Sequence, residues 1–202
     1  MNGCIFSAYC TEHLCDKSCP IYAETSYLLE RNGLNTETTL FSSSKKEFET
    51  AQNVLQTFQD RIGVFSASDT VKYAQLLTYV AICQNWKGSR LHCTVYNLKY
   101  SKYIDDLRNS WSSGSSDNLE YTKIWSESAK VLIVSNLDYV NFGDFESQLL
   151  LNMMQLRAQA HLTTIVVIPT SGIVTKSSAS NSFPIILKQK LSECMYRGGG
   201  IK

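Results

Sequence analysis

The sequence lacks an apolar run long enough to cross a membrane, and it has almost no net charge. A membrane-spanning helix needs about 20 consecutive apolar residues, and no such run is present. The formal net charge is +1, so the whole surface does not attract phosphates, and any nucleic-acid binding needs a local basic patch. Only 3 residues are proline and 44% are hydrophobic, which excludes wholesale disorder and predicts a packed core.

The first residues also lack the features of a secretory signal. Residues 1–8 contain neither a basic stretch nor a long apolar segment, and a signal peptide needs both. We therefore expect a cytoplasmic protein that does not associate with membranes.

Cysteine is unevenly distributed. Four of the 7 cysteines lie near the start of the sequence: Cys4, Cys10, Cys15 and Cys19. In a reducing compartment such a group indicates a metal rather than disulfides, and four thiolates, or three with His13, can complete a tetrahedral zinc site. An iron–sulfur cluster, which also uses four cysteines, is the alternative. We predict that residues 1–31 form a cysteine-rich metal-binding module, whose folding energy the metal supplies.

A linker and an amphipathic helix follow this module over residues 32–61. Asn32 and Gly33 end a short helical pattern that begins at Ile21, as glycine commonly does past a helix C-terminus. Apolar residues recur at three- and four-residue steps from Lys45 to Arg61, which predicts a helix with one buried face.

From residue 62 to residue 202 short apolar strands alternate with helices. The pattern predicts strands at 62–65, 91–96, 131–134 and 163–168, and helices at 71–85, 99–111, 145–160 and 184–195. It assigns loops to 112–117 and 169–182 and no element to 118–129. Apolar strands that alternate with helices are typical of an α/β fold, a parallel sheet covered by helices on both faces. The functional edge of such a sheet is at the carboxyl ends of its strands.

Four segments resemble helicase-loader AAA+ ATPases of the DnaC, DnaI and IstB type. The segment YLLERNGLNTETTLFSS resembles the entry to the ATPase core, and RIGVFSASDTVKYAQLLTYVAICQN stands where the family has its phosphate-binding strand, loop and helix. AKVLIVSNLDYVNFGDFESQLLLNMMQLRAQAH resembles the Walker B strand with its following helix, and LTTIVVIPTSG the next strand. The resemblance implies a P-loop, AAA+-like core over residues 62–202 and a docking role for the cysteine module.

The residues that would bind and hydrolyse ATP are altered. A phosphate-binding loop uses glycines, a lysine and a Ser/Thr for Mg²⁺, whereas this loop has no glycine, and its lysine and threonine are not adjacent. The acidic pair expected after the Walker-B-like strand is a serine and an asparagine. We predict a degenerate nucleotide site without ATP, formed by Ser66, Ser68, Asp69, Thr70, Lys72, Ser135 and Asn136.

Several residues near that site also have ordinary structural interpretations. Asp69 suits the N-cap of the following helix, and Lys72 is expected to be a solvated helix residue. Asp138 lies two residues past the Ser-Asn pair, and we expect it to be beyond reach of the site. We expect Arg157 to be a surface residue, and the alternative is that it faces a neighbouring subunit.

One further group has two interpretations. The tyrosines and lysines of residues 99–103 are candidates for contact with nucleic acid, because aromatic rings stack on bases and ammonium groups hold phosphates. A half-buried helix face is the simpler interpretation. The residues concerned are Lys99, Tyr100, Lys102 and Tyr103.

Together these features predict a non-catalytic, helicase-loader-like adaptor of phage or bacterial DNA replication. It would bind a replicative helicase or a homologous ATPase subunit, and it would hold zinc in its cysteine module. Formation of an oligomer is compatible with this role. An active ATP-dependent loader with an atypical site and a single-stranded DNA- or RNA-binding protein are the alternatives.

Overall fold

A parallel sheet of four strands lies at the centre of the computed structural model, which describes residues 28–34, 43–86, 95–113, 117–176 and 183–196. The strand order is β1-β4-β3-β2, and every pairing is parallel. The predicted α/β class and parallel sheet are therefore confirmed, and the carboxyl ends of the strands meet at one edge. The strands are β1 (Ile62–Ala67), β2 (Val95–Lys99), β3 (Val131–Ser135) and β4 (Thr163–Pro169).

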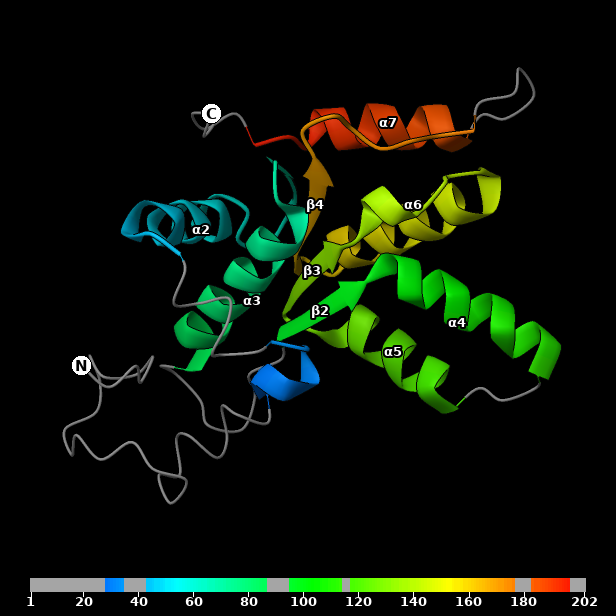
Figure 1. Cartoon of the computed structure of the whole chain (residues 1–202), viewed down its shortest axis with the longest axis horizontal. Coiled ribbons are helices and arrows are strands. Elements are labelled where there is room, and N and C mark those ends of the chain that lie inside the picture. The colour runs from blue at the N-terminus through cyan, green and yellow to red at the C-terminus, as the bar shows by residue number, and fades with distance from the viewer. Residues whose placement is uncertain (1–27, 35–42, 87–94, 114–116, 177–182, 197–202) are drawn as a thin grey trace.

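Helices cover both faces of the sheet (Figure 1). Helices α2 (Lys45–Thr57) and α3 (Thr70–Trp86) pack on one face. The other face is covered by α4 (Tyr100–Ser113), α5 (Asp117–Ser128), α6 (Asp144–Gln159) and α7 (Phe183–Glu193). A short 3₁₀ turn, η1 (Leu137–Tyr139), follows β3.

Successive residues of the central strands serve the two faces in turn. In β3, Val131 and Ile133 belong to the core under α2 and α3, whereas Leu132 and Val134 belong to the core under α6 and α7. Because side chains alternate along a strand, a strand with helices on both sides must be apolar at every position. This accounts for the continuous apolar runs from which the sheet was predicted.

Segments outside the four strands extend both margins of the sheet. The Val64 N–H donates to the Cys194 carbonyl at 2.8 Å and the Tyr196 N–H donates to the Val64 carbonyl at 2.7 Å, so the chain after α7 lies beside β1. At the other margin, residues 28–34 lie next to β2. Their helical turn ends at Gly33, which has φ +65°, and Leu34 N–H donates back to the Leu29 carbonyl at 2.9 Å, confirming the predicted helix stop.

The sequence pattern did not predict α5 and placed β2 too early. Helix α5 exposes Tyr121 and Ile124 and buries Ser126, so it has no apolar stripe from which a helix can be recognised. Strand β2 was predicted at 91–96 and begins at Val95, while residues 87–94 lie outside the described part of the chain. None of the described helices is long and apolar enough to span a membrane.

Arg157 is buried, which corrects the prediction that it lies at the surface. Only 1% of the residue is exposed, and its guanidinium group donates to groups on α5, β4 and the segments beside them. Burial lowers the pKa of Arg157 to about 10, so the side chain is charged at neutral pH. The acceptors are the carbonyls of Ser126, Glu127, Ala129 and Thr163 and the hydroxyl of Thr164.

Candidate functional site

The carboxyl edge of the sheet holds the residues of the predicted nucleotide site. Strand β1 ends at Ala67 and helix α3 begins at Thr70, so only Ser68 and Asp69 connect them. A P-loop has about four residues between its two glycines, and their N–H groups surround the phosphates. A connection of two residues, neither of them glycine, is too short to form that cradle.

Asp69 occupies the start of α3 as an N-cap, as predicted. Its Oδ1 accepts a hydrogen bond from the Lys72 backbone N–H at 2.8 Å, and its carbonyl accepts one from Tyr73 N–H at 3.1 Å. The N-terminus of a helix attracts anions because its N–H groups are unpaired and the helix dipole is positive there. Here the protein's own carboxylate occupies the position that a phosphate would need.

Lys72 forms an ion pair across the helix layer, which corrects the prediction that it is solvated. Its Nζ lies 2.7 Å from Oε1 of Glu47 on α2, and the two side chains are 25% and 20% exposed. The other carboxylate oxygen of Glu47, Oε2, accepts the Ser44 N–H at 2.7 Å. This hydrogen bond is part of the capping box of α2. Lys72 therefore links α3 to α2, and its ammonium group is engaged by Glu47.

Asp138 reaches the site, although its place in the sequence predicted otherwise. The Thr70 hydroxyl donates to Asp138 Oδ2 at 3.2 Å, linking the first turn of α3 to η1. Asn136 makes this possible, because its left-handed backbone conformation, with φ 59°, turns the chain sharply after β3. In this arrangement the Asp138 carboxylate is the acceptor for the Thr70 hydroxyl.

The remaining predicted residues are placed separately. Ser135 is buried, and its hydroxyl donates to Oδ1 of Asn97 at 2.8 Å. The Ser135 side chain is therefore directed toward the neighbouring strand β2. Ser66 is half-buried in β1, and Ser68 is exposed in the connection. Among the described residues no group of three or more His, Cys, Asp or Glu side chains is arranged to hold a metal ion.

The Glu47–Lys72 pair makes the stability of the fold depend on acid pH. The hydrogen bond from Lys72 is the main cause that lowers the pKa of Glu47 below its usual value of 4.5. A carboxyl with a lower pKa in the folded state stabilises the protein above its unfolded-state pKa, and loses that stabilisation as the pH falls through its folded-state value.

We therefore expect Glu47→Gln to lower the free energy of unfolding by about 1 kcal/mol at pH 7. The difference from the wild type should shrink below pH 4.5. Urea unfolding followed by circular dichroism at several pH values measures it. Glu49→Gln is the control, since its pair with Lys45 is exposed and longer, at 3.8 Å. A constant difference at every pH would exclude the ion pair as its cause.

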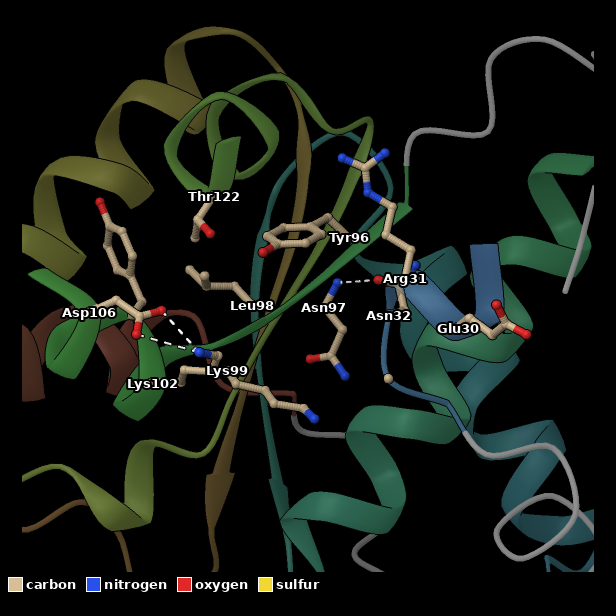
Figure 2. A pocket seen from close by; sticks show the side chains of 12 residues that line it. Glu30, Arg31, Asn32, Tyr96, Asn97, Leu98, Lys99, Lys102, Asp106 and Thr122 are labelled. Atoms are coloured by element: carbon tan, nitrogen blue, oxygen red, sulfur yellow. Dashed lines mark hydrogen bonds and ion pairs between the residues drawn. The ribbon is translucent and has the colours of Figure 1, made fainter. Parts of the chain in front are cut away.

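A second candidate site is a pocket at the outer edge of β2 (Figure 2). Its volume is about 200 Å³, and it lies between β2, residues 30–33, α4 and α5. Figure 2 shows Lys102 paired with Asp106 next to Lys99, and Asn97 hydrogen-bonded to Asn32. The pocket thus combines cationic, acidic and neutral polar groups at one margin of the sheet.

Asn32 covers part of the β2 edge with its side-chain amide. Its Oδ1 accepts the Asn97 N–H at 2.6 Å, and its Nδ2 donates to the Val95 carbonyl at 3.3 Å. The amide therefore pairs with the strand as a peptide group would, and it satisfies two buried backbone groups. The sequence pattern assigned Asn32 only to a helix stop, although Asn97, a polar residue in an apolar strand, was a signal of buried hydrogen bonding here.

The predicted Tyr/Lys group is divided by the structure. Lys99, Lys102 and Tyr103 line the pocket. Tyr100 is fully buried, stacks on Phe142 with ring centroids 5.8 Å apart and donates to the Glu146 carbonyl at 2.6 Å. Tyr100 therefore belongs to the core, and its ring is not available to a ligand.

The predicted metal ligands Cys4, Cys10, Cys15, Cys19 and His13 lie outside the described residues. The zinc site therefore stays a prediction from the sequence. In the described part of the chain, neither Cys83 nor Cys194 forms a disulfide.

No protein-family model matches the chain, and no curated protein sequence matches it. Among solved structures the chain is similar to the replication initiator DnaA bound to AMPPCP and single-stranded DNA. The TM-score is 0.47 with 11% sequence identity, and the match covers 88% of this chain and 56% of the DnaA chain. A similarity this distant is not evidence that this chain binds nucleotide or DNA.

Proposed function

We propose that this protein is a non-catalytic adaptor with a P-loop-like α/β core, which binds a replicative helicase or a related ATPase. The observation that carries the proposal is the carboxyl edge of the sheet, where a nucleotide would bind. The connection between β1 and α3 has only two residues. Asp69 caps α3 and Lys72 pairs with Glu47, so the groups at the phosphate-loop position are engaged in contacts within the protein.

Nucleotide binding would have to break these contacts. Removing an N-cap costs roughly 1 kcal/mol, and releasing Lys72 would leave the partly buried Glu47 carboxylate without its cation. The Asp69 carboxylate would in addition repel the phosphates at short range. The internal contacts therefore favour a protein that keeps its fold without ATP.

The same edge carries exposed apolar side chains, which suits a protein interface. Val71 is 41% exposed and Tyr139 is 71% exposed. They adjoin Thr70 and Asp138, whose hydrogen bond places both segments at this edge. Because Val71 follows Thr70 and Tyr139 follows Asp138 at this edge, we propose that both belong to the surface that contacts the ATPase partner.

The test is complex formation between the full chain and the purified replicative helicase of the same organism, measured by analytical ultracentrifugation with and without ATP. We expect a complex that does not require ATP and that the Val71→Asp/Tyr139→Asp variant weakens at least tenfold. The matched control is Tyr121→Asp/Ile124→Asp, which changes two comparably exposed side chains on α5. Absence of a complex would refute the adaptor role, and equal weakening by the control would refute the assignment of Val71 and Tyr139 to the interface.

The hydrogen bond between Thr70 and Asp138 favours a second candidate, an active loader with an atypical site. A hydroxyl and a carboxylate 3.2 Å apart provide oxygen ligands of the kind that Mg²⁺ prefers. An active loader would hydrolyse ATP, and Asp138→Asn would abolish that hydrolysis. An adaptor would show no ATP hydrolysis in either the wild type or the Asp138→Asn variant.

The cysteine module gives a separate prediction. We expect the full chain, purified without chelators, to contain one zinc ion, and Cys15→Ser to lose it and to weaken helicase binding. Native mass spectrometry identifies the metal by mass, with Cys83→Ser as a control because Cys83 lies on α3 and does not belong to residues 1–31. An iron–sulfur cluster in the protein would replace zinc in this account, and protein without any metal would refute it.

A further inference from the structure

We propose that the pocket at the β2 edge binds a small phosphorylated ligand rich in hydroxyl groups, such as a pentose phosphate or the ribose-phosphate part of a nucleotide. The pocket is separate from the carboxyl-edge contacts of α3 and η1, and the proposal does not depend on the adaptor function.

Two ammonium groups line one side of the pocket. The exposed Lys99 side chain forms no hydrogen bond or ion pair with the part of the chain that the structure describes. Lys102 lies 3.2 Å from Asp106, but its side chain is 71% exposed, so that pair is weak and can be exchanged for a ligand. Neither lysine is firmly paired. Together they provide the positive charge that a phosphate requires.

Arg31 also lines the pocket, and its guanidinium lies over the Trp125 ring, 3.5 Å from the ring centroid. The remaining polar groups suit hydroxyls rather than a second anion. Glu30, Asp106 and the half-buried Thr122 line the pocket, and the Asp106 carboxylate lies beside Lys102 (Figure 2). Carboxylate oxygens repel anions but accept hydrogen bonds from hydroxyl groups. A ligand with one phosphate and several hydroxyls satisfies both the cations and the acceptors, whereas a polyphosphate would meet Asp106 and Glu30 unfavourably.

The size and the walls of the pocket limit the ligand further. Its volume of about 200 Å³ is below the range of about 300–1,000 Å³ that is typical for drug-sized ligands, so a sugar phosphate or part of a nucleotide is accommodated. The Lys99 ammonium group lies close to Gly33, where a Cβ would be 2.9 Å from Lys99 Nζ. Because Asn32 holds the β2 edge in place, the pocket is formed before any ligand arrives.

Isothermal titration calorimetry of the full chain with ribose 5-phosphate tests the proposal. We expect saturable binding to one site, at least tenfold weaker affinity in Lys99→Gln/Lys102→Gln, and less than a twofold change in the control Lys45→Gln/Lys188→Gln, whose lysines are exposed on α2 and α7. Unchanged melting temperatures show that both double variants are folded.

Further titrations distinguish the sources of the phosphate. Tighter binding of AMP than of ribose 5-phosphate would identify a nucleotide as the ligand, and the reverse order would identify a sugar phosphate. Ribose should bind much more weakly than ribose 5-phosphate, and so should inorganic phosphate. The proposal is overturned if no titration saturates, if inorganic phosphate binds as well as ribose 5-phosphate, or if the control variant loses as much affinity as the pocket variant.

Discussion

Replacing Arg157 with methionine is expected to lower the free energy of unfolding by at least about 3 kcal/mol. The substitution leaves four backbone carbonyls and one hydroxyl without their donor in a buried region, and an unsatisfied buried polar group costs about 1–3 kcal/mol. Part of that cost is offset, because removing the charge also removes its desolvation penalty. Urea unfolding measures the effect, and the melting temperature should fall by about 6–12 °C.

Two further variants make the Arg157 prediction specific. Arg157→Lys keeps the charge and up to three donors, so we expect an intermediate loss. Arg108→Met is the control, because the Arg108 side chain is 54% exposed, and its buried partner Glu146 keeps a hydrogen bond from the Gly143 N–H at 2.9 Å. It should cost about 1–2 kcal/mol. If Arg157→Met were no more destabilising than Arg108→Met, the buried network would not hold the amino end of the sheet together.

Gly63→Ala is expected to be the second large effect, with a loss of about 1–3 kcal/mol. A Cβ at Gly63 would lie 2.1 Å from Cγ of Phe58, at the base of the ring, where it cannot move aside by a rotation of the outer ring atoms. Phe58 is itself held by Tyr196, with ring centroids 5.9 Å apart. Because the glycine is required by this close approach, the cost arises from overpacking.

A double-mutant cycle tests this cause. In the Phe58→Ala background the ring is absent, so Gly63→Ala should cost little, although Phe58→Ala alone is expected to cost about 3–5 kcal/mol. The free energies of unfolding are compared for the wild type, the two single variants and the double variant. Additive losses would show that Phe58 is not the reason for the glycine.

The order of helices and strands was largely predictable because apolar runs and helical periodicity report burial directly. The runs at 131–134 and 163–168 correspond to β3 and β4, whose residues face helices on both sides. Helix α5 was not predictable in this way, since its position depends on Arg157, which binds carbonyls at its C-terminal end. A contact between residues about 30 positions apart leaves no periodic pattern in the sequence.

The candidate sites were predictable only in part, because sequence spacing does not give the direction of side chains. The residues of the predicted nucleotide site were chosen from the motif positions, and the Asp69 cap was anticipated. The turn at Asn136 was not, so Asp138 was placed beyond reach of Thr70 although their side chains are hydrogen-bonded. Likewise Tyr100 and Tyr103 are close in sequence and both are buried, but only Tyr103 of the two also lines the β2-edge pocket.

The central claim is that the carboxyl edge of the sheet does not bind ATP. Native mass spectrometry of the full-length Lys99→Gln/Lys102→Gln variant with ATP and Mg²⁺ tests it most directly, because this variant is expected to weaken any nucleotide binding at the β2-edge pocket at least tenfold. We expect no bound nucleotide and no release of phosphate. Stoichiometric ATP that is lost on Thr70→Ala or Asp138→Asn would contradict the claim and would show that the carboxyl edge is a working nucleotide site.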